Sequence, residues 1–121
     1  MDEPLPSPPL HFEAAVQRPL SVVYRSAGDR WEGHDFTVEV ITARQGLDPY
    51  DVVMDFRELE AVLDALLEPM QGRLLSDLGL ADPLDLARTL AQALSPKVPS
   101  PARLAEVALT DGRGRRLSLR L

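Results

Sequence analysis

Apolar and polar residues alternate with a period of two in two early segments of the chain, a pattern that is typical of β-strands. The clearer segment spans residues 34–41, and His34 lies at the entry of the strand face that carries Phe36, Val38 and Val40. The earlier segment spans residues 12–24 and contains Pro19, which we expect to break or bend the strand. Gly28 lies between the two segments and predicts a turn there.

Two later segments repeat apolar residues at the spacing of an amphipathic helix. The first is predicted to begin after Asp55, whose carboxylate can cap the backbone amides of the first turn, and to end near Pro69. Its apolar stripe consists of Phe56, Leu59, Val62, Leu63, Leu66, Leu67 and Met70. The second is predicted to begin with Asp82 as cap and Pro83 at the first helical position, and to end at Ser95.

The chain closes with a predicted hairpin, in which Asp111-Gly112 is a strong turn signal. Its two strands alternate through Ala105, Val107 and Leu109, and through Leu117, Leu119 and Leu121. The predicted order is therefore β-β-α-α-β-β, an α+β fold in which a four-stranded antiparallel sheet carries two helices on one face. Such a sheet has open edges, which favours self-association.

The length of 121 residues predicts one domain. Residues 1–9 hold four prolines and two acidic residues, so we expect a flexible Pro-rich tail followed by a single domain over residues 10–121. No apolar run approaches the roughly 20 residues of a membrane helix, and no secretory leader is evident. We therefore expect a cytoplasmic protein without a membrane partner.

Charge and cysteine content exclude further classes of function. The net charge of −6 argues against a nucleic-acid partner, and the short basic cluster of Arg113, Arg115 and Arg116 is interpreted as a solvated hairpin rim rather than a phosphate site. The chain has no cysteine, which excludes disulfides, thiolate zinc sites and a cysteine nucleophile.

A longer pattern joins the second strand to the first helix. The chain reads Gly33-His34-Asp35-Phe36, then an alternating strand, then Val53-Met54-Asp55-Phe56 at a helix start. This run resembles the 6-pyruvoyl tetrahydropterin synthase family, which includes the 6-carboxytetrahydropterin synthases of queuosine biosynthesis and whose members show His-Gly-His-Asn-Tyr, a strand and Gly-Met-Val-x-Asp-Phe. The resemblance extends from about Leu10 to the end of the chain. It implies the tunnelling fold (T-fold), a role near tetrahydrobiopterin or queuosine biosynthesis, and a homo-oligomer, commonly trimers stacked into hexamers with active sites between subunits.

The resemblance also implies where the family's zinc ligands should be, and most of them are missing. Family enzymes hold zinc with three histidines, one at the end of a Phe-x-Ala-Ala-His-like first strand and two in a His-x-His at the start of the second. Val16 and Glu32 stand at the first two positions, and His34 alone is kept. Valine donates nothing, and the parity of His11 points it away from this face. Because catalytic zinc usually has three protein ligands, we expect no metal site and no cofactor. A strand-end histidine with a local hydrogen-bond partner is the other interpretation of His34.

The family's proton-transfer groups are replaced as well. Gly28 aligns with the general base or thiol, and Gln71 and Gly72 align with an Asp-His pair. None of these residues moves protons near neutral pH, so we expect no catalytic residue. The family reaction, a zinc-dependent lyase or synthase step on dihydroneopterin triphosphate, is expected to be lost.

One acidic position offers a ligand contact. Family members anchor the pterin with a glutamate in a Val-x-Val-x-Glu-Thr-like strand, and the segment 107–112 resembles it with Asp111 at the acidic position. The candidate ligand-binding residues are therefore Asp111, His34 and Glu32, while a purely structural turn is the other interpretation of Asp111.

Three hypotheses for function follow. The leading one is a 6-pyruvoyl tetrahydropterin synthase-like pseudoenzyme that binds a pterin-like or purine-like molecule or serves as a scaffold. The second is an active pterin-pathway enzyme with a site rebuilt around Glu32, His34 and Asp111. The third is a protein-interaction module that uses the Pro-rich tail or the acidic surface.

Overall fold

The computed structural model describes residues 10–25, 31–47 and 52–121, and for Arg25, Trp31 and Glu32 it describes the backbone alone. The predicted tail at residues 1–9 and the predicted turn at Gly28 therefore lie outside the described residues. In the described parts of the chain, no helix combines the length and apolar character needed to cross a bilayer.

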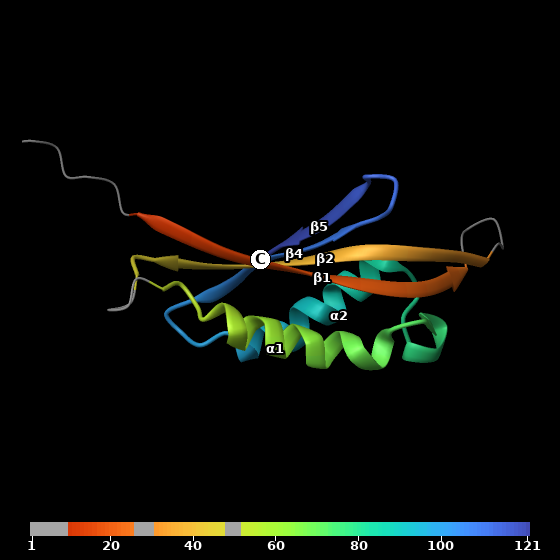
Figure 1. Cartoon of the computed structure of the whole chain (residues 1–121), viewed down its shortest axis with the longest axis horizontal. Helices are drawn as coiled ribbons and strands as arrows, with labels where there is room; N and C mark the ends of the chain where they lie inside the picture. The colour runs from red at the N-terminus through yellow and green to blue at the C-terminus, as the bar shows by residue number, and fades with distance from the viewer. Residues whose placement is uncertain (1–9, 26–30, 48–51) are drawn as a thin grey trace, which may run out of the picture.

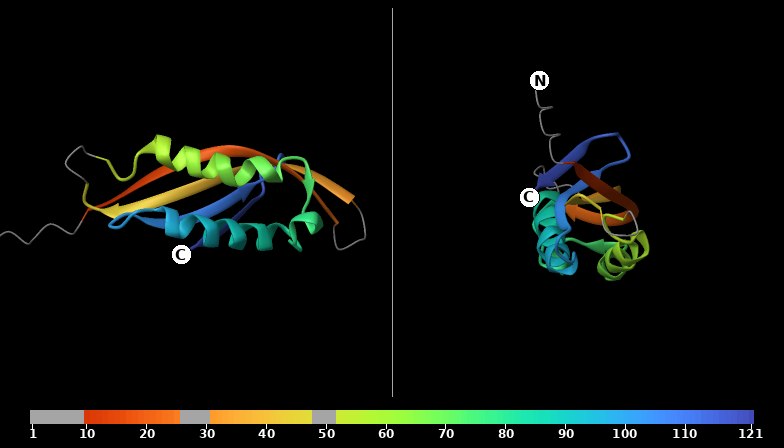
Figure 2. Two further views of the ribbon diagram at one scale, coloured as in Figure 1. Left: turned by 90° about the horizontal axis from the view of Figure 1, so that it is seen from below. Right: turned by 90° about the vertical axis from the view of Figure 1, so that its left-hand side faces the viewer.

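Two helices cover one face of a five-stranded sheet (Figures 1 and 2). The strand order is β3-β1-β2-β4-β5, and all neighbours are antiparallel except β3, which runs parallel to β1. The predicted α+β class and the position of both helices are confirmed. The elements are β1 His11–Arg25, β2 Trp31–Gln45, α1 Phe56–Leu67, η1 Glu68–Met70, β3 Arg73–Leu74, η2 Ser76–Leu78, α2 Pro83–Leu94, η3 Ser95–Lys97, β4 Arg103–Thr110 and β5 Arg116–Arg120.

The core lies between the sheet and the helices. Both helices begin as predicted, because the Asp55 carboxylate accepts a hydrogen bond from the Arg57 amide at 2.8 Å and the Asp82 carboxylate accepts one from the Asp85 amide at 2.8 Å. The inward strand positions and the helix stripes meet in a fully buried set that includes Leu20, Val22, Val38, Val40, Leu59, Leu63, Leu86, Leu90 and Leu94. Phe56, predicted to be part of the stripe, is instead 53% exposed.

The first strand is longer than predicted and passes through Pro19 without a break in its pairing. The Ser21 amide and carbonyl and the Val23 carbonyl form hydrogen bonds with residues of the segment from Gln71 to Leu75. Odd-numbered residues in this part of β1 therefore direct their backbone amides and carbonyls away from β2. Pro19 shares this parity, and its missing amide therefore removes no hydrogen bond from the β1–β2 ladder.

The predicted sheet of four strands is wrong by one, because β3 adds a short fifth strand beside β1. Gly72, at φ +70°, turns the chain after η1, and its amide donates to the Ser21 carbonyl at 2.7 Å. The Leu75 amide then donates to the Val23 carbonyl at 2.9 Å. A strand of two residues is too short to alternate, which is why the hydrophobic pattern does not reveal it.

The sheet face opposite the helices carries linked polar side chains. Arg116 donates to Glu39 at 2.9 Å and to Glu106 at 3.5 Å, and Gln17 donates to Glu39 at 2.9 Å. The Gln17 amide, followed by the Arg116 guanidinium, holds the pKa of Glu39 below its ordinary value. Polar groups on this face satisfy one another across four strands, so it is a polar surface rather than a second apolar core.

Candidate ligand-binding site beside His34

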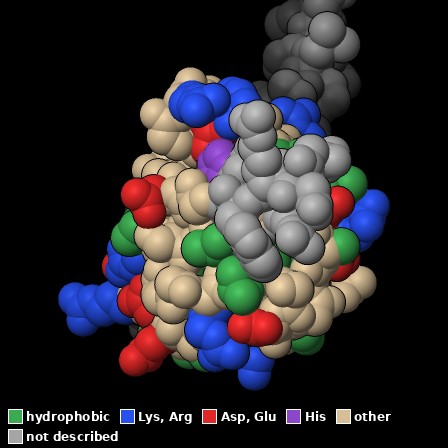
Figure 3. Space-filling view, turned by 90° about the vertical axis from the view of Figure 1, so that its right-hand side faces the viewer, with side chains coloured by type: hydrophobic (Ala, Val, Ile, Leu, Met, Phe, Trp, Pro, Cys, Tyr) green, Lys and Arg blue, Asp and Glu red, His purple; other side chains and the backbone are tan. Residues whose placement is uncertain are grey.

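A cleft of about 620 Å³ lies at the end of the sheet where β1 ends and β2 begins. Its walls come from β1, β2, the β4–β5 turn and the start of α2, and they include Tyr24, His34, Phe36, Pro83, Asp111, Arg113, Arg115 and Arg116. The view of this end of the molecule shows a histidine at the surface with basic and acidic side chains nearby (Figure 3). The structure thus brings two predicted site residues, His34 and Asp111, into one cleft.

One wall of the cleft is a row of three stacked rings. The His34 imidazole lies between Tyr24, with ring centroids 5.2 Å apart, and Phe36, with centroids 5.4 Å apart. The interplanar angles are 24° and 16°, and the Tyr24 hydroxyl lies 3.3 Å from His34 Nε2. These separations are typical of favourable aromatic pairs. His34 therefore has the local partner that the structural interpretation of this residue predicts.

The register between β1 and β2 does not bring Val16, the last residue of the predicted first-strand motif, to His34 as the resemblance implies. Val16 pairs with Val40, six residues along β2 from His34, so the two residues are separated by roughly 20 Å. The residues of β1 that meet this end of β2 are Val22, opposite His34, and Tyr24, opposite Glu32. The alignment of Val16 with a histidine that must meet His34 is therefore wrong.

Tyr24 stands instead at the end of a segment with the motif's spacing. Leu20-Ser21-Val22-Val23-Tyr24 carries a large apolar residue followed four positions later by the ring that contacts His34. Tyr24 contacts His34 and is a site residue that was not predicted from the sequence. Tyr24 pairs with Glu32, and the turn signal between the two strands is the sequence feature that could have indicated this pairing.

This donor set does not fit the family's zinc. Among the described residues, no group of three histidine, cysteine, aspartate or glutamate side chains is placed to hold a metal ion. Val22 has no donor atom, and Tyr24 offers only a phenol hydroxyl, which is not among the usual protein ligands of zinc. The side chain of Glu32 lies outside the described residues. We therefore derive no chemical step through a metal at this site.

Asp111 holds the turn between β4 and β5. Its Oδ1 accepts from the amides of Arg113 at 2.9 Å and Arg115 at 3.0 Å, and its Oδ2 accepts from Arg115 Nε at 2.6 Å. The Arg115 amide, together with the Arg115 side chain and the Arg113 amide, holds the pKa of Asp111 below its ordinary value. The turn spans Asp111 to Arg115 with Gly114 at φ +79°, so it is longer than the two-residue turn predicted from Asp111-Gly112. These contacts favour the structural interpretation of Asp111.

Gln71 and Gly72, at the family's Asp-His positions, attach β3 to the edge of β1. Gln71 Nε2 donates to the Pro19 carbonyl at 2.8 Å, and Gln71 Oε1 accepts from the Ser21 amide at 3.0 Å. The side-chain amide thus acts as one more pair of strand backbone groups. Both residues therefore have a structural role in joining β3 to β1.

Known proteins with a similar sequence or structure support the fold described above. A sequence model of 6-pyruvoyl tetrahydropterin synthase matches residues 11–120. The chain belongs to the 6-pyruvoyl tetrahydropterin synthase family. No curated protein sequence matches the chain. The fold is therefore the tunnelling fold of this family, as the sequence predicts.

Solved structures of two 6-pyruvoyl tetrahydropterin synthases and of one uncharacterized protein share the fold at low sequence identity. The 6-pyruvoyl tetrahydropterin synthase of Caenorhabditis elegans superimposes with a TM-score of 0.77 at 14% identity, covering 93% of this chain and 96% of that one. The Plasmodium falciparum enzyme gives a TM-score of 0.75 at 9% identity, over 92% of this chain and 98% of that one. An uncharacterized protein from Wolinella succinogenes gives 0.66 at 12% identity, over 92% and 98%. At these identities the likeness establishes the fold alone.

Proposed function

We propose that this member of the 6-pyruvoyl tetrahydropterin synthase family binds a planar pterin-like or purine-like heterocycle in the cleft beside His34, without the zinc-dependent lyase or synthase reaction. The observation that carries the proposal is the Tyr24–His34–Phe36 stack, which lines the cleft. The family relationship supplies the class of ligand. The rings supply a surface against which a flat heterocycle packs.

The polar residues that we propose for the site are His34, Glu32 and Asp111. His34 is the central ring of the stack, with its Nε2 3.3 Å from the Tyr24 hydroxyl, and Glu32 lies two residues earlier in β2. Asp111 lines the same cleft, with two amides and one guanidinium already bound to its carboxylate. We therefore propose the ring stack as the principal contact and Asp111 as the residue that positions the turn beside it.

Loss of the ring of Tyr24 is expected to weaken pterin binding. In a fluorescence titration with neopterin, and in a calorimetric titration with guanosine as the purine, the Tyr24→Ala variant is expected to bind about tenfold more weakly than the wild type, because stacking a heterocycle on an aromatic ring contributes roughly 1–3 kcal/mol. The Tyr24→Phe variant keeps the ring and is expected to bind within about threefold of the wild type.

Two further variants locate the binding. Phe56→Ala removes an exposed aromatic ring that does not line this cleft, and it should leave the affinity for neopterin and guanosine unchanged. Asp111→Ala separates the two roles of that residue, since wild-type affinity in a folded variant assigns Asp111 to the turn alone. Absence of saturable binding by the wild type up to about 1 mM ligand, or equal affinity in wild type and Tyr24→Ala, would contradict the proposal.

We also propose that the chain assembles into a homo-oligomer, as a trimer or hexamer. Strand β5 has a partner only in β4, and β3 covers only Val22 and Val23 of the long β1, so both edges of the described sheet leave backbone groups available for pairing. Sedimentation velocity at micromolar concentration is expected to show a trimer or larger species, and a monomer throughout would contradict the assembly. A cytoplasmic location stays a prediction from the sequence, to be tested by cell fractionation.

A further inference from the structure

A second and larger cleft, of about 900 Å³, lies at the other end of the sheet, where α1 begins. Its lining includes Phe12 of β1, Arg44 of β2, the segment from Val52 to Glu58 and the segment from Pro99 to Ala102. Most of these side chains are apolar. The cleft contains the Val53-Met54-Asp55-Phe56 motif, to which the proposed function assigns no role.

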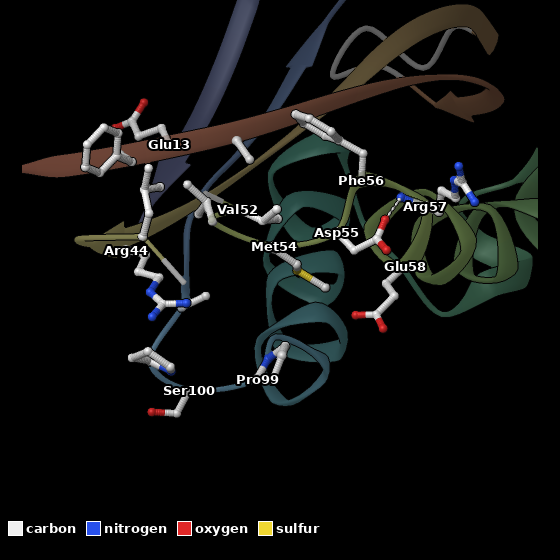
Figure 4. A pocket seen from close by; sticks show the side chains of 16 residues that line it. Glu13, Arg44, Val52, Met54, Asp55, Phe56, Arg57, Glu58, Pro99 and Ser100 are labelled. Atoms are coloured by element: carbon white, nitrogen blue, oxygen red, sulfur yellow. Dashed lines mark hydrogen bonds between the residues drawn. The ribbon is translucent and has the colours of Figure 1, made fainter. Parts of the chain in front are cut away.

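Arg44 is the polar group that distinguishes this cleft. Figure 4 shows its side chain leaving β2 and extending toward Ser100. The residue is half-buried, and its Nε atom is buried without a hydrogen-bond partner. A buried donor without an acceptor is destabilising, and native structures satisfy most such groups.

The contrast with Arg18 shows that a half-buried guanidinium without a partner is unusual among the described residues. Among the arginines whose side chains the structure describes, only Arg18 and Arg44 are half-buried, and the others are exposed. Arg18 bonds to two carboxylates of α1, those of Glu60 and Asp64. The side chain of Arg44 has no ion pair or hydrogen bond to any described residue. Its guanidinium is the half-buried cation of the larger cleft, whose other arginine, Arg57, is exposed.

The carboxylates of this cleft are at its exposed rim. Glu13, Asp55 and Glu58 are all exposed, and Asp55 is occupied as the cap of α1. In Figure 4, Asp55 and Glu58 lie on the opposite side of Met54 from Arg44. Water and salt screen such exposed charges more effectively than the half-buried guanidinium. The interior of the cleft therefore combines apolar walls with one positive charge.

We propose that this cleft binds a small organic anion with an apolar body, whose carboxylate is held by Arg44. Ligand sites in proteins are typically apolar clefts of this size with one or a few polar groups that orient the ligand. A carboxylate supplies the acceptor that the guanidinium lacks, and Phe12, Met54 and Phe56 are placed to contact the apolar body. This site is separate from the cleft beside His34 and does not depend on the function proposed there.

The test uses 4-phenylbutyrate as the anion and 4-phenylbutanol as its uncharged analogue. In titrations followed by amide chemical shifts, we expect phenylbutyrate to shift the amides of Arg44, Met54 and Ala102, and the alcohol to bind about 10- to 100-fold more weakly, the factor supplied by a charge-assisted hydrogen bond. The Arg44→Gln variant is expected to lose the same factor for phenylbutyrate and to bind the alcohol as the wild type does.

Arg57→Gln is the matched control, because Arg57 lines the same cleft but is exposed. It should bind phenylbutyrate within about twofold of the wild type. Thermal denaturation verifies that both variants fold. Three results would each overturn the proposal: no binding by the wild type at 10 mM (roughly the weakest affinity such contacts give), equal affinity in the folded Arg44→Gln variant, or shifts confined to residues around His34.

Discussion

A double variant, Tyr24→His with Glu32→His, is expected to bind about one zinc ion per subunit, with a Kd of about 1 μM or tighter. Tyr24 and Glu32 pair directly across β1 and β2, and His34 follows two residues later in β2. The register therefore brings three histidines together on neighbouring strands, the ligand set that holds catalytic zinc in many enzymes. Zinc titration monitored by isothermal calorimetry, with elemental analysis of the dialysed protein, measures both the affinity and the stoichiometry.

The matched control moves one of the two new histidines. In the Val16→His, Glu32→His variant the first histidine pairs with Val40, roughly 20 Å from His34, so three ligands cannot meet on one ion. Its affinity is expected to be at least about 100-fold weaker. If this variant binds zinc as tightly as the Tyr24→His, Glu32→His protein, the strand register described for this site is wrong.

Truncation of Leu90 to alanine is expected to lower the free energy of unfolding by about 2–5 kcal/mol, a large part of the stability of a small domain. Leu90 is fully buried on the inner face of α2, within the cluster that joins both helices to the sheet. Its removal leaves a cavity that rigid helix–sheet packing cannot close. Thermal denaturation should show a decrease in Tm of roughly 8–20 °C.

Leu84 provides the comparison on the same helix. It is 41% exposed, and Leu84→Ala is expected to cost less than about 1 kcal/mol. Similar losses for the two variants would mean that α2 does not pack on the sheet through Leu90. That outcome would contradict the two-layer fold rather than the proposed ligand site.

Long periodic elements and their caps could be predicted from the sequence alone. Asp55 and Asp82 cap the helices as predicted, and the alternation from residue 34 onward correctly assigns His34 to the inner face of β2. These features depend on local chemistry and on periods that the sequence displays directly. The short strand β3 is different, because it exists through hydrogen bonds from Gln71 and Gly72 to the edge of β1, which are contacts between distant residues.

The candidate site was predicted in part, and the errors in that prediction arise because the register between β1 and β2 was not known from the sequence. His34 and Asp111 do line one cleft, but Val16 does not meet His34, because a motif match fixes residue types and leaves the pairing of strands open. The role of Tyr24 follows only from the residue it opposes. Arg44 was missed altogether, since the signal there is a missing partner, and a missing partner cannot be seen before the surrounding carboxylates are placed.

The central proposal is that this family member keeps the family's fold but binds its heterocyclic ligand without a metal ion. The zinc content of the wild-type protein tests the second part of this proposal most directly. Protein purified without a histidine tag, loaded with zinc and then dialysed, should contain less than about 0.1 zinc per subunit by elemental analysis, because His34 meets Tyr24 and Val22 rather than further imidazoles. A stable content near one zinc per subunit, lost in the His34→Ala variant, would contradict the proposed metal-free site.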